Sequence, residues 1–540
     1  MSDTGKMYDV CIIGSGAGGA PVAAALARNG LKIALLERGP LYSDRDLKKD
    51  ELTVCRMPMF KPDDAQGARE IHYGNAPPLF TNHLWTATCV GGGTRVMSGF
   101  FFRMKEEDFK PRTRFGAIDN AAHQDWPIDL ADLQPYYDCV ESDIGIDGSA
   151  LVKKSNGSSM TPLKAHPVST LIDTACAQLG LHPIPTPRAV LSEEWKNRGP
   201  CSYSGFCGSY ACLTGAKASM HETYIKDALE TGNVTLLPDH YVYSLEARGN
   251  AIQRVHFFGP GNAPGKIRAR IFILACSSIE TARLLLNSHT TEHPDGLANS
   301  SGLVGKNLTF TMPSEVTGFF KKDLFPSPNA ASSPFVQRSI QDLHILNDDD
   351  LSYKRGGTVV FLFPHPNPIQ RVMMLSYSGN QRIWGKRLKD RIREYFSYNH
   401  LMSDSFIDFL PNPQTFVTIS KTTRDYWGIP SARIHIVPHL ESIKSARIMA
   451  KHLVSLYNVM GAVGAYYNPN PFTAGELQHG TCRFGNDPKT SVLDPFCRSH
   501  DIKNLFVTDA SFMPSGLPIP STFTTMANSL RVAGHIYGKG

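Results

Sequence analysis

Apolar residues along the chain form runs of two kinds, separated by turns rich in Gly, Pro and Asp. At the start, the β-branched run at residues 10–13 is typical of a buried parallel strand. An Ala-rich stretch with helical spacing follows to Arg28, where Asn29 and Gly30 end it, and a second apolar run covers residues 31–36. This order predicts a strand–helix–strand unit with parallel strands.

Both patterns return further along the chain. The segment 270–288 reads as a strand, a tight turn and an amphipathic helix, which predicts a further strand–helix unit of the same domain. Near the end, the run 504–509 ends on an acid, Asp509, and a helical pattern follows over 521–536. Between about 312 and 460 the pattern favours strands. The other predicted strands are at 234–247, 252–258, 266–274, 359–364, 371–378, 415–420 and 432–438, with a strong helix at 444–461.

A glycine motif joins the first strand to the first helix. Gly14, Gly16 and Gly19 form a G-x-G-x-x-G, in which the first permits the turn, the second admits a pyrophosphate and the third allows close packing. The helix start offers free N–H groups and partial positive charge to phosphates. Glu37 ends the second strand 18 residues after Gly19 (37 − 19), where it can accept hydrogen bonds from ribose hydroxyls. These features predict a dinucleotide site.

A second glycine run, Gly91-Gly92-Gly93-Thr94, follows an irregular, proline-broken stretch at 41–83. Backbone that carries no side chains can lie close to a flat ring or a phosphate. We interpret this run as a further part of the cofactor site, with a loop that binds nothing as the alternative.

The composition is that of an ordinary globular enzyme, with 41% hydrophobic and 19% charged residues. The net charge of +6 (55 basic minus 49 acidic) comes without a long Lys or Arg block, so neither nucleic acid nor an anionic membrane is indicated. No apolar run approaches about eighteen residues, so no transmembrane helix is expected. The first strand begins too early for a signal peptide. We expect a cytoplasmic protein, or one exported folded with a partner subunit.

The chain has eleven cysteines, most of them single residues in apolar or helical contexts. Such thiols are expected to be reduced and packed. The exception is a Gly-rich loop with Cys201, Cys207 and Cys212. Three thiolates at this spacing can hold the irons of a cluster, whereas zinc would need a fourth ligand, and none is near in sequence. Packed thiols or a stray disulfide are the alternatives.

With these motifs in this order, the chain resembles the glucose–methanol–choline (GMC) oxidoreductases over essentially its whole length. It is most similar to the bacterial FAD-dependent sugar, gluconate and glycoside dehydrogenase catalytic subunits, and more distantly to pyranose oxidase. The resemblance implies an α/β fold: a Rossmann-like FAD-binding domain assembled from both chain ends, with an inserted substrate domain built on a largely antiparallel β-sheet plus helices. The expected FAD-binding segments are 1–105, 215–311 and 480–540, and the substrate or cap segments are 106–214 and 312–479.

The resemblance also implies which residues contact the cofactor. FAD is expected to bind non-covalently, because residues 95–97 (Arg-Val-Met) stand where some relatives carry a flavin-linked His. Val242 matches a strand residue whose backbone contacts adenine, and Asp509 with Ala510 matches an acid–small pair near the ribityl chain. The full expected set is Gly14, Gly16, Ala17, Gly18, Gly19, Glu37, Arg38, Gly91, Gly92, Gly93, Thr94, Val242, Ala275, Asp509 and Ala510.

A hydride leaving an alcohol for FAD requires a base for the hydroxyl proton, and neutral His suits this role at pH 7. The family places a His four residues before the Thr of a Gly-Thr pair, but this position holds Leu477, and the nearest His is His479. A second family position, commonly Asn, falls on Pro520. We predict that His479 is the base. The alternative is that His479 only packs beside the site and has no catalytic role. Ser521 or Thr522 is the candidate hydrogen-bond donor.

Similar Cys-rich loops in the dehydrogenase subunits carry a [3Fe-4S] cluster that passes electrons from flavin to a haem partner. The resemblance therefore implies such a cluster on Cys201, Cys207 and Cys212, and a small subunit and a cytochrome or quinone acceptor as partners. The expected function is an FAD-dependent dehydrogenase of a sugar, glycoside or polyol hydroxyl. An oxygen-using oxidase and, less favoured, a non-redox lyase of the same fold are the alternatives. An NAD(P)-linked reductase would need a second nucleotide fingerprint, which the sequence lacks.

Overall fold

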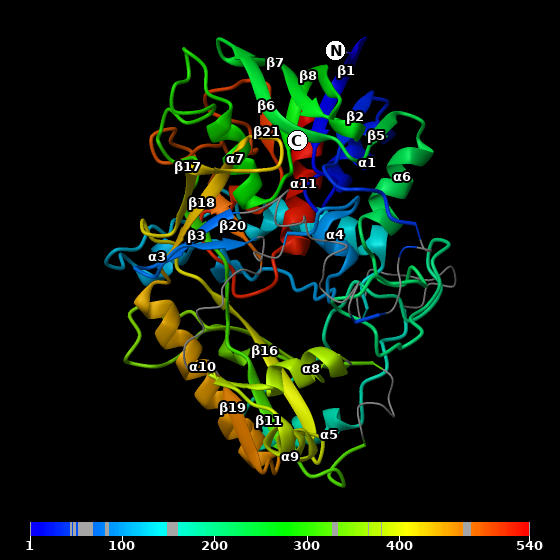
Figure 1. The fold of residues 1–540 in the computed structure, drawn as a ribbon, viewed down its shortest axis with the longest axis vertical. Helices are drawn as coiled ribbons and strands as arrows, with labels where there is room; N and C mark the ends of the chain where they lie inside the picture. Colours follow the sequence, from blue (N-terminus) through cyan, green and yellow to red (C-terminus); the bar gives the residue numbers. More distant parts are fainter. Residues whose placement is uncertain are drawn as a thin grey trace.

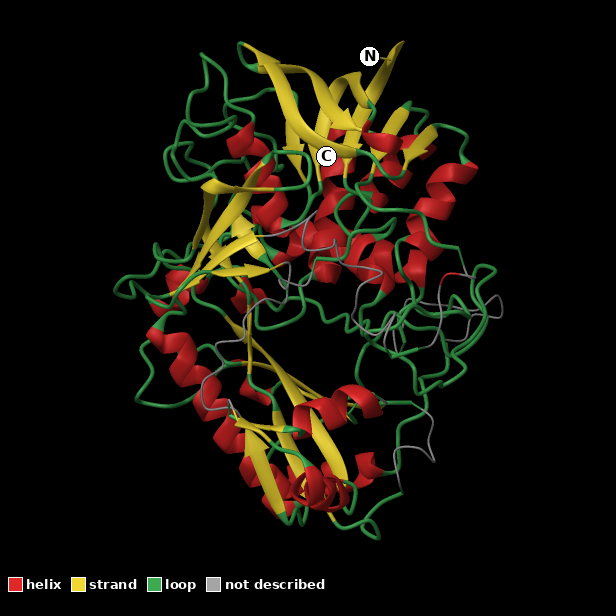
Figure 2. Ribbon diagram, in the orientation of Figure 1, coloured by secondary structure: helices red, strands yellow, loops and turns green. Residues whose placement is uncertain are grey.

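The computed structural model describes residues 2–43, 46, 50–51, 69–81, 86–147, 160–326, 333–364, 367–379, 381–467 and 477–538. Two large β-sheets lie at opposite ends of the molecule, the first at the top of Figure 1 and the second at the bottom. Helices lie against both sheets (Figure 2), and both chain ends lie at the first sheet. Within the described ranges, every helix is too short or too polar to cross a bilayer.

The first sheet is built from both ends of the chain. Its strands are β1 (Ser2–Ile13), β2 (Ile33–Leu36), β5 (Val234–Leu237), β6 (Tyr241–Arg248), β7 (Ala251–Phe258), β8 (Pro264–Leu274) and β21 (Leu505–Val507). They pair in the order β5-β2-β1-β8-β7-β6, and β21 also pairs with β8. The pairs of β1, β2, β5, β8 and β21 are parallel, and β7 is antiparallel to both its neighbours. The predicted assembly of this α/β domain from both chain ends is confirmed.

Helices cover the first sheet and bury its strands. Val10, Cys11 and Ile12 of β1 are fully buried, as expected for a strand with helices on its faces. The Ala-rich α1 (Ala20–Arg28) packs against α11 (Thr522–Ile536), and α11 packs against α4 (Leu130–Ile144). Three further helices are α3 (Pro111–Phe115), α6 (Lys226–Glu230) and α7 (Ser278–Asn287).

The second sheet is antiparallel throughout, as predicted. Its strands are β10 (Thr311–Pro313), β11 (Val316–Phe320), β12 (Phe335–Ile340), β13 (Gly357–Leu362), β16 (Asn399–Asp408) and β19 (Gly464–Tyr467). They pair in the order β12-β13-β16-β11-β19, with β10 on β16. The long helix α10 (Leu440–Val459) runs beside this sheet (Figure 1), and α5 (Val168–Gln178) packs near its β12 edge.

Two smaller sheets lie between the large ones. A four-stranded sheet has the order β17-β18-β3-β4, and β20 pairs with β9. Their bounds are β3 (Arg69–Tyr73), β4 (Leu79–Thr81), β9 (Lys306–Thr309), β17 (Phe416–Arg424), β18 (Pro430–Ile436) and β20 (His479–Thr481). Figure 1 shows β3, β17 and β18 beside the first sheet, so residues far apart in sequence meet next to the predicted cofactor segments.

One predicted strand, at 371–378, is wrong. The chain forms the helix α8 (Pro368–Leu375), a two-stranded turn of β14 (Tyr377–Ser378) and β15 (Gln381–Arg382), and then α9 (Gly385–Tyr395). Pro at the first helical position favours this start. The short apolar run at 372–375 resembles a buried strand, but α8 buries no residue and lies on the surface.

A buried ionic cluster ties residues 106–108 to the second sheet. The Arg355 guanidinium donates to Asp108 at 2.7 Å and to Asp408 at 3.2 Å, and His344 lies 2.7 Å from Asp108. These side chains are at most 2% exposed. Burial alone would raise the pKa of Asp108, but the charges of Arg355 and His344 hold it well below its usual range.

Candidate cofactor site

A cavity of about 270 Å³ opens at the carboxyl ends of β1, β2, β8 and β21. This is the place where open α/β sheets bind ligands. Its walls come from both ends of the chain. The predicted residues that line it are Gly14, Gly16, Ala17, Gly18, Glu37, Arg38, Gly92, Gly93, Val242, Ala275, Asp509, Ala510, Ser521 and Thr522.

The glycines of the first motif differ in what they leave room for. A Cβ on Gly14 (φ +100°) would lie 2.2 Å from the carbonyl oxygen of Ala275, and one on Gly19 would lie 1.9 Å from that of Gly14. Both glycines are therefore required by packing. A Cβ on Gly16 would meet nothing nearer than the Cα of Gly92, at 4.0 Å. The two glycine runs thus face each other, and the space beside Gly16 belongs to the cavity.

Three helices begin at the cavity wall. Residues 16–18 come just before α1, Ser277 is the N-cap of α7, and Ser521 with Thr522 starts α11. Each helix N-terminus carries about half a positive charge and unpaired N–H groups. Their convergence favours an anionic ligand such as a pyrophosphate.

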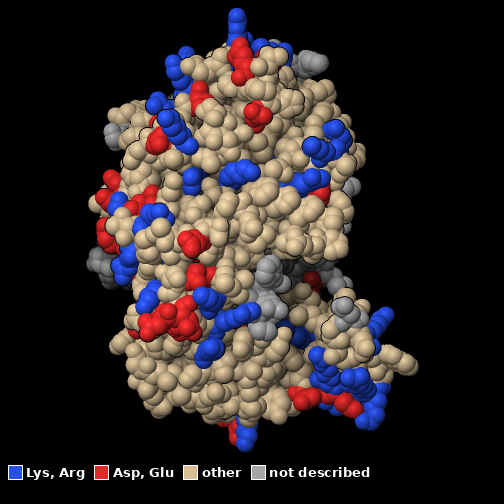
Figure 3. Space-filling model, turned by 90° about the vertical axis from the view of Figure 1, so that its left-hand side faces the viewer, with Lys and Arg blue, Asp and Glu red and all other residues tan. Residues whose placement is uncertain are grey.

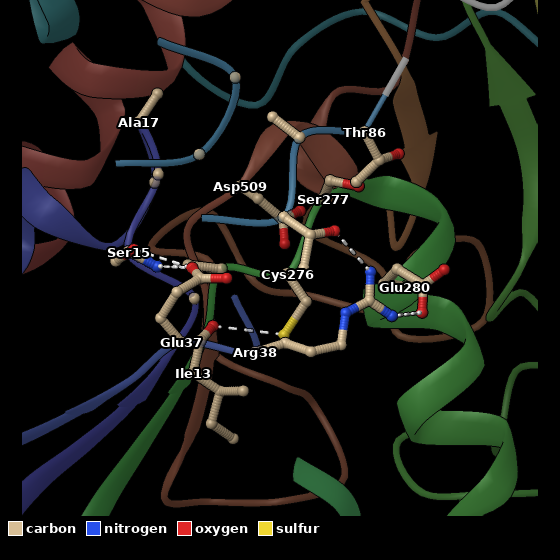
Figure 4. A pocket seen from close by; sticks show the side chains of 18 of the residues that line it. Ile13, Ser15, Ala17, Glu37, Arg38, Thr86, Cys276, Ser277, Glu280 and Asp509 are labelled. Carbon is tan, nitrogen blue, oxygen red and sulfur yellow. Dashed lines mark hydrogen bonds and ion pairs between the residues drawn. The ribbon is translucent and has the colours of Figure 1, made fainter. Parts of the chain in front are cut away.

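Glu37 is held by the first glycine run. Its carboxylate accepts from the backbone N–H and hydroxyl of Ser15 at 3.1 and 2.8 Å, and from the Gly39 N–H at 3.0 Å. Figure 4 shows Glu37 turned toward Ser15. The Ser15 hydroxyl also accepts from the Gly91 N–H at 3.0 Å, so Ser15 joins the acid to the second glycine run. Burial raises the pKa of Glu37, and the bonds from Gly39 and Ser15 oppose this.

Asp509 closes the cavity from the C-terminal end of β21. It accepts from the Thr281 hydroxyl at 2.5 Å and from the Ser511 N–H at 2.9 Å. Burial raises the pKa of Asp509, and these hydrogen bonds counteract that rise. Gly18 packs directly on this turn, since a Cβ there would lie 2.8 Å from the Asp509 Cα. The acid thereby links the last strand to the first glycine motif.

An ionic group forms one wall and was not predicted. Glu280 of α7 lies 2.7 Å from Arg69, 3.3 Å from Arg283 and 3.7 Å from Arg38. Burial would raise the pKa of Glu280, but the three guanidinium charges hold it far below its usual range. Figure 4 shows Arg38 reaching toward Glu280. The i,i+3 spacing of Glu280 and Arg283 on the predicted 270–288 unit is the only sequence signal for this group.

The remaining predicted cofactor residues, Gly19, Gly91 and Thr94, do not line the cavity and instead pack against residues that do. Gly19 packs on Gly14. Thr94 donates to the Gly91 carbonyl at 2.6 Å and accepts from the Met220 N–H at 2.9 Å, which holds the second glycine run in its turn. Their assigned contacts with FAD stay predictions.

His479 lies in β20 and is fully buried. Neither ring nitrogen has a hydrogen-bond partner among the described residues. Leu477 and Gln478 line the cavity, whereas His479 does not. Burial lowers the pKa of His479 to about 3, so the ring is neutral at pH 7. Its role as the base stays a prediction.

The three cysteines of the 201–212 loop are partly exposed and unbridged. Burial raises the pKa of Cys201. At Cys212 the Lys217 charge and nearby hydrogen bonds outweigh burial and lower the thiol pKa. In the described part of the chain, no three His, Cys, Asp or Glu side chains form a group that could hold a metal ion. The [3Fe-4S] cluster on these three cysteines stays a prediction.

Comparison with known proteins gives one family. Two family models described as GMC oxidoreductase match residues 80–312 and 411–529. The chain is 30% identical to paromamine 6'-oxidase of Streptomyces fradiae, over 99% of this chain and 92% of that protein. It is 28% identical to 2-methyl-1,2-propanediol dehydrogenase of Mycolicibacterium austroafricanum (99% and 96% covered) and 26% identical to the fructose dehydrogenase large subunit of Gluconobacter japonicus (99% and 99%).

Solved structures share the fold. Formate oxidase of Aspergillus oryzae RIB40 matches with a TM-score of 0.65 at 14% identity, over 99% of this chain and 98% of that one. Pyridoxine 4-oxidase of Mesorbium loti matches with a TM-score of 0.63 at 16% identity, over 98% and 99%. Both alignments include the two large sheets, since they cover nearly the whole chain.

Proposed function

The chain belongs to the GMC oxidoreductase family, and from that premise we propose that it oxidises a hydroxyl of a sugar, glycoside or polyol, with FAD as the hydride acceptor. The observation that carries the proposal is the cavity where two glycine runs and three helix N-termini face each other. Relatives named for paromamine, a propanediol and fructose support the substrate class, because all three compounds carry hydroxyl groups.

The residues present fit FAD. Gly16 leaves open backbone that can admit a pyrophosphate, and α1, α7 and α11 begin at the same cavity wall. We propose that Glu37 accepts hydrogen bonds from the ribose hydroxyls and that Asp509 lies near the ribityl chain. When bound, FAD supplies an acceptor for the two electrons of a hydride. The protein's part is to hold the alcohol C–H in reach, exclude water and take up the hydroxyl proton.

For the proton, we propose His479, acting after a local shift of its loop. The loop context supports this, since His479 follows two cavity residues, Leu477 and Gln478. His479→Asn should then lower kcat about 100-fold or more at unchanged flavin content. Leu477→His, which restores the family's usual position, should recover activity in the His479→Asn background. If His479→Asn stays active, and adding Leu477→His does not raise its kcat, His479 serves packing and not catalysis.

For the electrons, we propose a dehydrogenase that passes them to an external acceptor such as a cytochrome or quinone, with a small subunit as a further partner. The name of the fructose dehydrogenase large subunit supports a partner subunit, because a large subunit implies a smaller one in that protein. Anaerobic iron and sulfide analysis with EPR tests the cluster assigned to Cys201, Cys207 and Cys212. An iron-free protein that makes peroxide from oxygen during turnover would favour the oxidase alternative.

One spectrum tests the proposed function as a whole. The purified protein should show a flavin absorption band that bleaches when a substrate sugar or polyol is added without oxygen. A matched addition of a fully O-methylated sugar, which has no free hydroxyl, should not bleach it. A flavin band that no hydroxyl compound bleaches would favour the lyase alternative, and a colourless protein would refute FAD binding.

A further inference from the structure

The α8–α9 segment, residues 368–396, carries a basic and apolar surface that the cofactor site does not use. Both helices bury no residue, and α8 packs on α9. Figure 3 shows Lys and Arg side chains gathered on a lobe at the lower right, at the end of the molecule where Figure 1 places α9.

The charge of this segment is exceptional within the chain. It holds seven basic residues (Arg371, Arg382, Lys386, Arg387, Lys389, Arg391 and Arg393) and two acidic ones (Asp390 and Glu394). Its net charge is therefore +5 (7 − 2), which leaves +1 (6 − 5) for the other residues together. The side chains of Lys386 and Arg393 are 89% and 74% exposed, so the charge faces solvent.

The same segment exposes large apolar side chains. Trp384 is 79% exposed at the start of α9, and Met373 and Met374 are 62% and 61% exposed on α8. Ile369, Tyr377 and Phe396 are about half exposed. A soluble surface seldom clusters residues of this kind without an interaction.

We propose that this segment docks the protein on an anionic lipid surface. Apolar side chains among Lys and Arg on surface helices are the composition of interfacial membrane anchors, and Trp favours the boundary between headgroups and acyl chains. Each Lys or Arg near such a surface adds electrostatic attraction. A second copy of this chain fits less well, because a two-fold interface would bring +5 against +5.

The signal was missed in the sequence because the basic residues alternate with apolar and polar ones. No long Lys or Arg block forms, and the apolar run at 372–375 reads as a strand. The structure exposes both sets on one short helical pair. The proposal is independent of the substrate and of the cysteine loop.

Vesicle sedimentation with the full-length holoprotein tests this docking. Binding is expected to vesicles of phosphatidylcholine with phosphatidylglycerol, and to weaken strongly at high salt. Lys386→Gln, Arg387→Gln and Lys389→Gln together should lower the partition coefficient about tenfold or more. Arg248→Gln, Arg268→Gln and Lys503→Gln together remove the same charge from exposed positions on the first-sheet half and should leave it unchanged.

A second variant tests the apolar part. Met373→Ser, Met374→Ser and Trp384→Ser together should also lower partitioning about tenfold, whereas the matched triple at exposed Leu440, Val463 and Tyr466 should not. All variants should keep flavin content and activity on a soluble alcohol. Equal binding by charge and control variants, or no binding to any vesicle, would overturn the proposal. Dimers that the α8–α9 variants abolish, or capture of an acidic partner protein in place of vesicles, would also overturn it.

Discussion

At the residue scale, Gly16 stands apart from the other glycines of its motif. The folded chain leaves 4.0 Å around a Cβ placed there, whereas Gly14, Gly18 and Gly19 would collide with backbone. The absence of a side chain at Gly16 therefore serves a ligand and not the packing of the protein.

Gly16→Ala is accordingly expected to fold normally and to lose FAD affinity about tenfold or more, because the new methyl takes the space of a pyrophosphate. The flavin-to-protein absorbance ratio and FAD titration of the apoprotein measure this. Gly464→Ala is the control, since a Cβ there meets nothing nearer than 3.9 Å and lies outside the cavity. Wild-type FAD content in Gly16→Ala would contradict this assignment.

His479 gives a prediction about pH. Its folded pKa is lowered to about 3, while an unfolded His titrates near 6.5, so below pH 6.5 the unfolded chain binds a proton that the folded chain does not. The contribution of the neutral His479 ring to the free energy of unfolding is fully present above pH 6.5. It falls by about 2 kcal/mol between pH 6.5 and 5.

His479→Gln should remove this part of the acid sensitivity. Urea unfolding at pH 7.5 and pH 5 should show the variant gaining about 2 kcal/mol relative to wild type at the lower pH. His452→Gln, at an exposed helix position, serves as the control. A difference between His479→Gln and wild type that is the same at both pH values would disprove the buried neutral ring.

The residues that could be predicted are those whose role follows from local spacing, such as Gly14, Gly16 and Glu37. Ser15 and Thr281 could not, because each acts through a partner brought by a distant segment: Glu37 with Gly91 for Ser15, and Asp509 for Thr281. Such pairings depend on the tertiary fold.

At the element scale, Arg355 joins the 106–108 turn to β16. Arg355→Met would leave Asp408 buried without its cation and Asp108 with His344 alone, and should destabilise the protein by about 3–5 kcal/mol in urea unfolding. Arg338→Met removes a partly exposed pair with Asp173 and should cost about 1 kcal/mol or less. A loss at Arg355 no larger than that at Arg338 would show that the cluster adds no stability.

Strands with neighbours on both sides were predictable because burial imposes long apolar runs on them, as in β1 and β8. The α8 segment was not, since a run of four apolar residues fits a strand and a surface helix equally. The 234–247 run split into β5 and β6 because Asp239 takes a left-handed conformation (φ 57°).

At the scale of the whole molecule, ligand binding and stability are linked. The cavity walls come from segments near both ends of the chain, so FAD binds the assembled protein and not the unfolded chain. Free FAD at about 100 times its Kd should raise the unfolding free energy by about 2.7 kcal/mol. Thermal scans with increasing FAD measure this, with Gly16→Ala as the variant that should respond less at each FAD concentration. A wild-type melting temperature independent of FAD would contradict the site.

The assembly from both chain ends was predictable from the order of motifs along the chain. The placement of α8 and α9 on the outside was not, because helix exposure depends on which surface the rest of the chain leaves uncovered.

The pairing of β21 with β8 has a consequence for synthesis of the protein in the cell. A ribosome adding about 5–20 residues per second needs about 25–100 seconds to pass from the end of β1 to β21. Throughout that interval the nascent chain lacks Asp509 and the start of α11, so one wall of the FAD cavity is missing. Cofactor loading therefore waits until the segment from β21 to the start of α11 has been made, and flavin acts on chains that have reached that length.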